Sequence, residues 1–109
     1  MTFDELKSQV KTCGFEEVRM DNNELFEAVI LKKGLGALMA KLTLIFGPPA
    51  WPSENKLSNE VQNIIQHYGG IMPGQSLYFT HLDSDPVFVM FWPWGDKEHI
   101  TVKIGKKTE

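Results

Sequence analysis

Three residues with metal-binding side chains alternate along one short stretch of the sequence: His81, Asp83 and Asp85. Alternate side chains of an extended strand point to the same face, so an imidazole and two carboxylates would lie together. Such a donor set is able to bind a divalent cation. However, Asp83-Ser84-Asp85-Pro86 is also typical of a hairpin turn, where aspartate hydrogen-bonds its own backbone. We predict the turn, and we assign no metal ligand and no cofactor.

A second group of ionisable residues, Asp96, Glu98 and His99, lies further along the chain. If the three C-terminal strands form a meander, the turns that carry the two groups lie at opposite ends of the middle strand. Seven residues at about 3.3 Å each then separate them by roughly 20 Å. We therefore do not expect the two groups to form one site.

The sequence has no signature of a reactive nucleophile or a phosphate loop. Cys13 falls on an apolar helical stripe, which predicts a buried and unreactive thiol. Residues 45–49 follow a predicted strand and precede a helix, but their prolines lack the amides that would bind phosphate. Because Cys13 is the only cysteine, no intramolecular disulfide is possible, and we expect a reducing, cytoplasmic location.

The three tryptophans, Trp51, Trp92 and Trp94, each adjoin a proline. Aromatic rings held on rigid backbone give a large contact area at low entropic cost, which is a common way to build a binding anchor. Pro93 cannot donate a hydrogen bond within a sheet, so the strand before it should end there and leave Trp94 exposed at the end of the strand. We predict that Trp92 and Trp94 form the rim of a binding surface, to which Trp51 also contributes; the alternative is that all three tryptophans pack in the core.

Residues 87–92 form a strand pattern that is apolar on both faces, whereas an antiparallel strand commonly has one face in water. Such a strand needs cover on both sides, from a helix, a ligand or another chain. The predicted binding residues are the tryptophans and their large neighbours on this sheet: Trp92, Trp94, Trp51, Met90, Phe88 and Tyr78.

The first helix is predicted over residues 3–13. Thr2 and Glu5 form a capping box, the apolar residues that follow have helical spacing, and Gly14 ends the helix. Strands are predicted over residues 15–20 and 25–32. The glycines of 33–36 then suggest a hairpin to a return strand over 38–46.

A loop is predicted at 47–52, because its three prolines remove donors. Ser53 is a suitable N-cap for a second helix, whose apolar residues from Leu57 to Tyr68 form one stripe. Three more strands are predicted, at residues 76–82, 87–92 and 99–104.

We therefore predict one α+β domain over residues 1–109, a length that suits one core. Its order is αβββαβββ, with an antiparallel sheet of about six strands and two helices on one face. The lysines at 32, 33 and 41 could form a modest basic patch with those at 103, 106 and 107, although lysines that guard sheet edges explain them as well.

The predicted function is a non-enzymatic binding or adaptor module that acts through the apolar sheet face and the tryptophan rim, as a homodimer. The net charge of −3 argues against binding nucleic acid, and no apolar run is long enough to span a membrane. No leader peptide is expected at this N-terminus. The alternative is a small-molecule-binding or enzymatic domain with a pocket between the sheet and the second helix, lined by Tyr68, Tyr78, His81 and Trp92.

Overall fold

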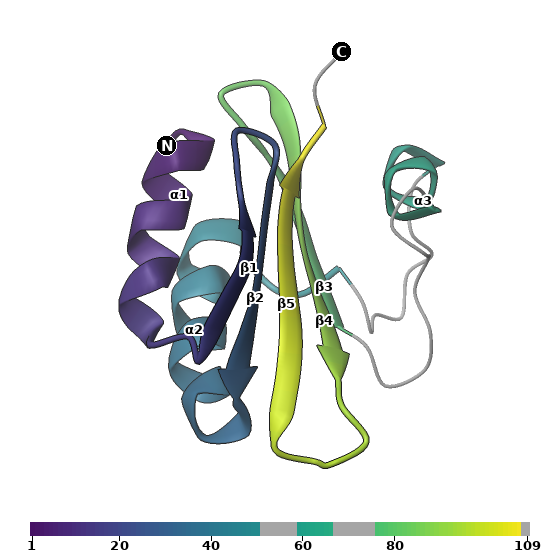
Figure 1. The fold of residues 1–109 in the computed structure, drawn as a ribbon. Coiled ribbons are helices and arrows are strands. Elements are labelled where there is room, and N and C mark those ends of the chain that lie inside the picture. The colour runs from purple at the N-terminus through teal and green to yellow at the C-terminus, as the bar shows by residue number, and fades with distance from the viewer. Residues whose placement is uncertain (51–58, 67–75, 108–109) are drawn as a thin grey trace.

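An antiparallel sheet forms the middle of the molecule (Figure 1). The computed structural model describes residues 1–50, 59–66 and 76–107. Within these residues the sheet has five strands, in the spatial order β1-β2-β5-β4-β3. Their bounds are β1 Glu17–Asp21, β2 Leu25–Leu31, β3 Ser76–Leu82, β4 Asp85–Pro93 and β5 His99–Lys106.

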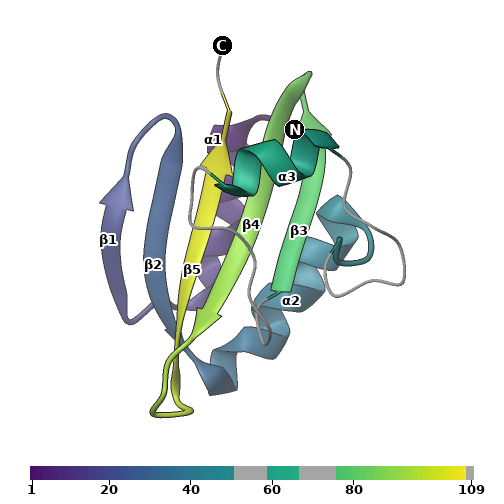
Figure 2. The ribbon, with the colours of Figure 1, turned by 90° about the vertical axis from the view of Figure 1, so that its right-hand side faces the viewer.

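Helices lie on both faces of this sheet. Helix α1 (Phe3–Val10), which continues into the 3-10 turn η1 (Lys11–Cys13), and helix α2 (Lys32–Phe46) share one face. Helix α3 (Asn59–Gln66) crosses the opposite face over β4 and β3 (Figure 2). On that second face, none of the described helices covers β1 or β2. No helix in the described residues is long and apolar enough to cross a membrane.

Helix α1 begins and ends as its sequence predicts. The Thr2 side chain accepts a hydrogen bond from the Glu5 amide, and the Glu5 side chain accepts one from Thr2, which completes the capping box. Gly14 ends the 3-10 turn with a φ of 79°, a conformation that glycine adopts without steric cost. Lys7 ties the helix to the β1–β2 turn, because its Nζ lies 2.9 Å from both Asp21 Oδ1 and the Asn22 carbonyl oxygen.

The predicted hairpin at 33–36 and the predicted strand over 38–46 are both wrong, because these residues form α2. Helical spacing brings one set of apolar residues onto the sheet or its edge: Leu35, Leu38, Met39, Leu42 and Phe46. Neither Gly34 nor Gly36 has a positive φ, so neither forms the tight turn that its sequence suggests.

The α+β class and the antiparallel sheet are confirmed, but the strand count and the order of elements are not. The described order is helix, two strands, two helices, three strands, in place of αβββαβββ. The two-layer arrangement is also wrong. Since α2 joins α1 on one face, the later helix α3 covers the other face instead.

Both faces of β4 are buried, as its sequence predicts. Val87, Val89 and Phe91 belong to the core beneath α1 and α2. Phe88 and Met90 belong to a smaller core with Val61, Ile64 and Leu77 beneath α3. A helix therefore provides the cover that β4 needs on each side.

Candidate functional site

Three of the predicted binding residues are fully part of the core. Phe88 and Met90 are both 0% exposed beneath α3. Tyr78 is 1% exposed and lies on the other face, where its hydroxyl oxygen is 2.9 Å from Thr43 Oγ1. Trp51 lies outside the described residues. Trp92 and Trp94 are half-buried. Among the predicted binding residues that the structure describes, these two are therefore the ones that a partner could contact.

Trp94 is held in place by three neighbouring residues at the end of the sheet, which make four contacts with it. Its backbone amide donates to the His99 carbonyl oxygen at 2.8 Å, and its Nε1 donates to Thr101 Oγ1 at 2.8 Å. The His99 ring stacks on the indole at a centroid distance of 4.8 Å, and the Arg19 guanidinium lies 5.3 Å from the indole centroid. We call this group, with Asp96, the Trp94 corner: Arg19, Trp94, Asp96, His99 and Thr101.

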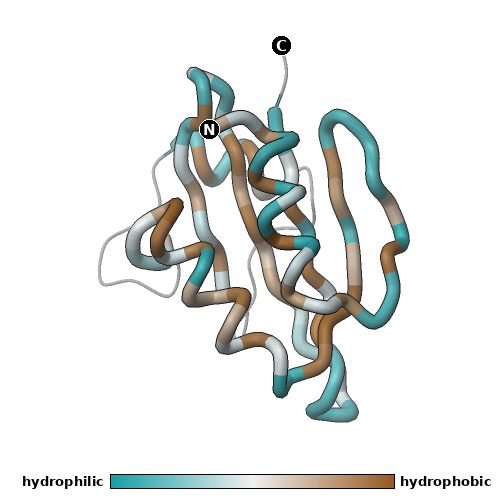
Figure 3. Tube along the Cα trace, turned by 90° about the vertical axis from the view of Figure 1, so that its left-hand side faces the viewer, coloured by the Kyte–Doolittle hydropathy of each residue, from teal (hydrophilic) through white to brown (hydrophobic). Residues whose placement is uncertain are grey.

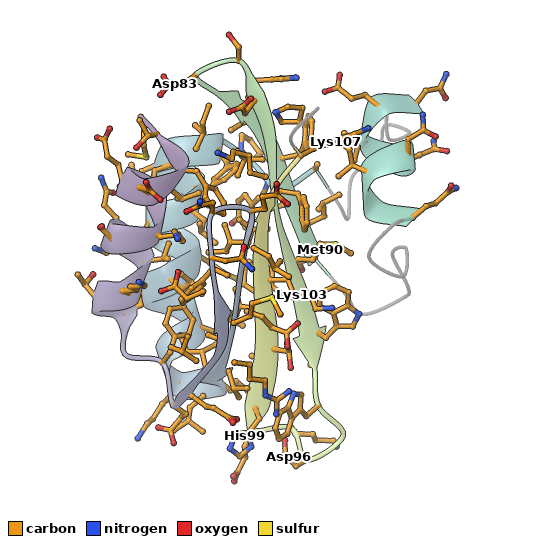
Figure 4. All side chains as sticks on the ribbon, turned by 45° about the horizontal axis from the view of Figure 1, so that its top comes forward. Asp83, Met90, Asp96, His99, Lys103 and Lys107 are labelled. Atoms are coloured by element: carbon orange, nitrogen blue, oxygen red, sulfur yellow. The ribbon has the colours of Figure 1, made fainter. Side chains whose placement is uncertain are left out.

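Asp96 organises the loop between β4 and β5. Its Oδ1 accepts hydrogen bonds from the Glu98 and His99 amides at 2.9 and 3.0 Å, and its Oδ2 lies 2.5 Å from His99 Nδ1 (Figure 4). The amide of Glu98, then the amide and ring of His99, lower the pKa of Asp96 from 3.8 to about 2. The carboxylate thus orients the imidazole, an arrangement that could support proton transfer but also suits a purely structural turn.

Trp92 lies further up the same face of the sheet. Lys103 Nζ lies 4.7 Å from the centroid of the Trp92 ring and 3.4 Å from Glu27 Oε1. Glu27 and Lys103 are directly opposite each other on β2 and β5. The two half-buried tryptophans therefore each carry a cation above the ring, on the side of the sheet where no described helix covers β1 or β2.

Two adjoining clefts lie beside the Trp94 corner, and the sequence interpretation missed both. The lysine cleft has a volume of about 520 Å³ and is lined by Leu31, Lys32, Lys33, Lys97 and Glu98. The ring cleft has a volume of about 280 Å³ and is lined by Lys32, Leu35, Pro93, Trp94, Lys97, His99 and Ile100. They share Lys32 and Lys97, which belong to segments that are far apart in the sequence.

The basic patch suggested by the sequence is not assembled. Because β2 and β5 are antiparallel, Leu31 lies opposite His99 and Leu25 lies opposite Gly105. Lys32 and Lys33 are therefore at one end of the sheet and Lys106 and Lys107 at the other. The lysine that lies near Lys32 and Lys33 is instead Lys97, which lines the same cleft. Lys97 is in the loop before β5, so its position depends on the pairing of β5 with β2.

The turn at Asp83 is confirmed. Asp83 and Ser84 have φ values of 49° and 72°, as the two central residues of a type I′ hairpin turn require, and Leu82 pairs with Asp85 across it. His81 Nε2 lies 2.8 Å from Glu60 Oε1 of α3. The described residues contain no group of three or more histidine, cysteine, aspartate or glutamate side chains that could hold a metal ion.

A cleft does exist between the sheet and α3, where the small-molecule alternative places a pocket. It has a volume of about 330 Å³ and is lined by Glu60, Ile64, His81, Ser84, Pro86 and Lys107. Of the predicted lining residues it contains His81. Neither Tyr78, on the opposite face, nor Trp92 lines it, and Tyr68 lies outside the described residues.

Removing the Asp96 charge is expected to weaken the β4–β5 loop in a pH-dependent way. A carboxyl whose pKa is lowered by folding contributes stability above its ordinary pKa, and that contribution is lost as the pH falls through the folded value. The Tm of an Asp96→Asn variant should therefore lie below that of the unmodified protein at pH 7. The two values should converge between pH 3.8 and about 2, where Asp96 protonates.

Thermal denaturation at neutral and acidic pH tests this, with Glu16→Gln as a control that makes the same change in net charge. Glu16 is exposed, and its variant should show no such convergence. A difference in Tm between Asp96→Asn and the unmodified protein that stays constant down to pH 2 would contradict the assignment.

The chain was also compared with known families and structures. No family model, curated protein or solved structure matches it.

Proposed function

We propose that this chain is a non-enzymatic binding module that acts as a homodimer, with the exposed side of α2 as the dimer interface. The observation that supports the proposal is the apolar character of this helix on both sides. Apolar colours run through most of α2, whereas polar colours alternate along α1 (Figure 3). An apolar face of a helix is normally buried against another surface.

Beyond its first turn, where Lys32 and Lys33 are exposed, α2 turns small and apolar residues away from the sheet. We call these exposed residues the outer face of α2: Gly36, Ala37, Ala40 and Leu44. Leu44 is 88% exposed, the highest value among the exposed large apolar side chains of the described residues. Lys41 does not interrupt this face, because its Nζ turns toward α1 and lies 2.9 Å from Thr12 Oγ1.

A second copy of the chain is the partner that fits this face best. No residue of the outer face is charged, so like-charge repulsion between two copies that meet across a twofold axis is confined to the exposed Lys32 and Lys33 in the first turn of the helix. Gly36 and Ala40 are four residues apart, which places two small side chains on one ridge and allows two helices to approach closely. Leu44 of each copy would then pack on the other helix.

The edge strand β1 is a poor alternative interface. All five of its residues are exposed, its pairing with β2 is irregular between Val18 and Met20, and three of its residues are charged. Bulges and charges on an edge strand oppose pairing with another chain. We therefore place the dimer interface on α2 rather than on the sheet, and Trp92 and Trp94 remain as a separate surface for a ligand or partner.

The substitution Leu44→Lys is expected to convert the dimer to a monomer. Burial of one leucine side chain contributes about 1.5–3 kcal/mol, and a twofold interface contains the residue twice. The loss should weaken the dimer by about a hundredfold or more in Kd. Sedimentation equilibrium over a wide range of concentration measures it.

Val18→Lys is the matched control, because Val18 is an apolar side chain that is 52% exposed on β1. The control should remain a dimer. If the unmodified protein is monomeric at every concentration, the proposal is wrong. If Val18→Lys dissociates and Leu44→Lys does not, the interface lies at β1.

The second candidate function is small-molecule binding. The observation that favours it is the pair of clefts at the Trp94 corner, which combine lysines with an aromatic wall. This candidate requires no dimer. Its site includes the first turn of α2 and is cationic and aromatic, whereas the outer face of α2 is small and apolar.

A further inference from the structure

We propose that the two clefts at the Trp94 corner form one binding site for a small organic anion with a flat ring. The lysine cleft would hold the anionic group, and the ring cleft would hold the ring. The site extends the small-molecule candidate by naming its location and ligand class, and it is independent of the proposed dimer interface.

Three lysines line the lysine cleft, and none of them has a carboxylate partner in the part of the chain that the structure describes. Some other basic side chains are paired: Lys7 and Lys11 with Asp21, and Lys103 with Glu27. By contrast, Lys32, Lys33 and Lys97 form no ion pair with any described residue. Unpaired cations that line one concave surface attract an anion more strongly than the same charges spread over a convex surface.

The acidic residues nearby do not cancel these charges. The Asp96 carboxylate is engaged by two backbone amides and by His99. Glu98 does line the lysine cleft, and its backbone carbonyl oxygen accepts a hydrogen bond of 2.7 Å from the Lys32 amide. Three lysines against one glutamate leave a net charge of about +2 on the cleft wall.

Lys97 occupies a strained backbone position. Its φ is 62°, in the left-handed region, which is sterically unfavourable for a residue other than glycine. Gly95, two residues earlier, does not adopt this conformation. The loop therefore places a lysine where glycine or asparagine would be more stable, and the lysine side chain lines both clefts.

The ring cleft has a rigid apolar wall. Leu35, Pro93 and Ile100 supply aliphatic surface, and Trp94 and His99 supply aromatic surface. The hydrogen bond from Trp94 Nε1 to Thr101 Oγ1 fixes the indole, so little side-chain freedom remains to be lost when a ligand binds. A flat apolar wall next to a cationic cleft fits a ligand that has an aromatic body and an anionic end.

Adenosine 5′-monophosphate is the probe, and its two halves are the controls. Adenosine carries the ring without the charge, and inorganic phosphate carries the charge without the ring. Tryptophan fluorescence and isothermal titration calorimetry should show that the nucleotide binds more tightly than either half. The affinity should fall as salt is added, because exposed charges are screened.

Two variants separate the clefts. Lys33→Gln with Lys97→Gln should weaken nucleotide binding by about tenfold, because two of the three cations that line the lysine cleft are removed. Trp94→Leu should weaken nucleotide binding while leaving any phosphate binding unchanged. The matched control is Lys106→Gln with Lys107→Gln, which removes the same charge at the opposite end of the sheet.

Each remaining outcome overturns the proposal. Nucleotide affinity that falls equally in the Lys106→Gln and Lys107→Gln control would show a general charge effect. Phosphate that binds as tightly as the nucleotide would exclude the ring cleft, and adenosine that binds as tightly would exclude the lysine cleft. The absence of binding by all three probes at millimolar concentration would exclude the site. None of these results alters the dimer prediction, because Leu44→Lys is measured without ligand.

Discussion

The substitution Met90→Lys is expected to lower the free energy of unfolding by about 4 kcal/mol or more. Met90 is 0% exposed and packs in the core beneath α3. It also lies directly opposite Lys103 on β5, so the new ammonium group would be both buried and next to a like charge. Urea denaturation followed by circular dichroism measures the loss.

Met90→Asp is the sharper comparison, because it buries a charge at the same place but of the opposite sign. An aspartate there faces the Lys103 ammonium across the strand pair, so it should lose about 1 to 2 kcal/mol less than the lysine variant. Equal losses for the two variants would contradict the pairing of Met90 with Lys103. Because Met90 is buried, variants at this position report on the stability of the fold and not on a binding surface.

The second large effect is expected for Gly105→Ala, at about 3 kcal/mol of destabilisation. A Cβ at position 105 would lie 2.2 Å from Cζ and 2.5 Å from Cε1 of Phe88, which covers the glycine from the opposite strand. The Phe88 ring is itself 0% exposed, so it has no free space to move into. Thermal and urea denaturation of the variant measure this loss.

Gly95→Ala is the matched control, because an added Cβ there has nothing within 4 Å. Its effect should be within about 0.5 kcal/mol. In a Phe88→Leu background the ring that meets the new Cβ is gone, and Gly105→Ala should cost at least ~1 kcal/mol less than in the unmodified protein. Additive effects of the two substitutions would show that the clash with Phe88 is not the cause.

Local sequence patterns predicted the elements whose signals are short and unambiguous. The capping box at Thr2, the glycine stop at Gly14 and the turn at Asp83 are each formed by neighbouring residues, and each is confirmed. Helix α2 was missed because it is apolar on both sides, which hides the helical period, and because Gly34 and Gly36 resemble a hairpin turn.

The candidate site could be predicted in part. Pro93 indicates the end of β4, and Trp94 next to it is half-buried as a rim residue would be. Arg19 and Lys32 could not be placed beside Trp94 from the sequence, because their positions depend on the pairing of β2 with β5. Burial of Phe88 and Met90 likewise depends on α3 crossing to the second face of the sheet.

The position of β5 has a consequence for how the chain folds. β5 is the last strand along the chain, yet it lies at the centre of the sheet, between β2 and β4. Among the described strands, the hairpins β1–β2 and β3–β4 share no backbone pairing, and β5 joins them by pairing with β2 and β4. Ribosome-bound chains that stop before His99 should therefore hold two separate hairpins, whose exposed edges make them targets for chaperones. Cooperative folding should begin only when β5 has emerged.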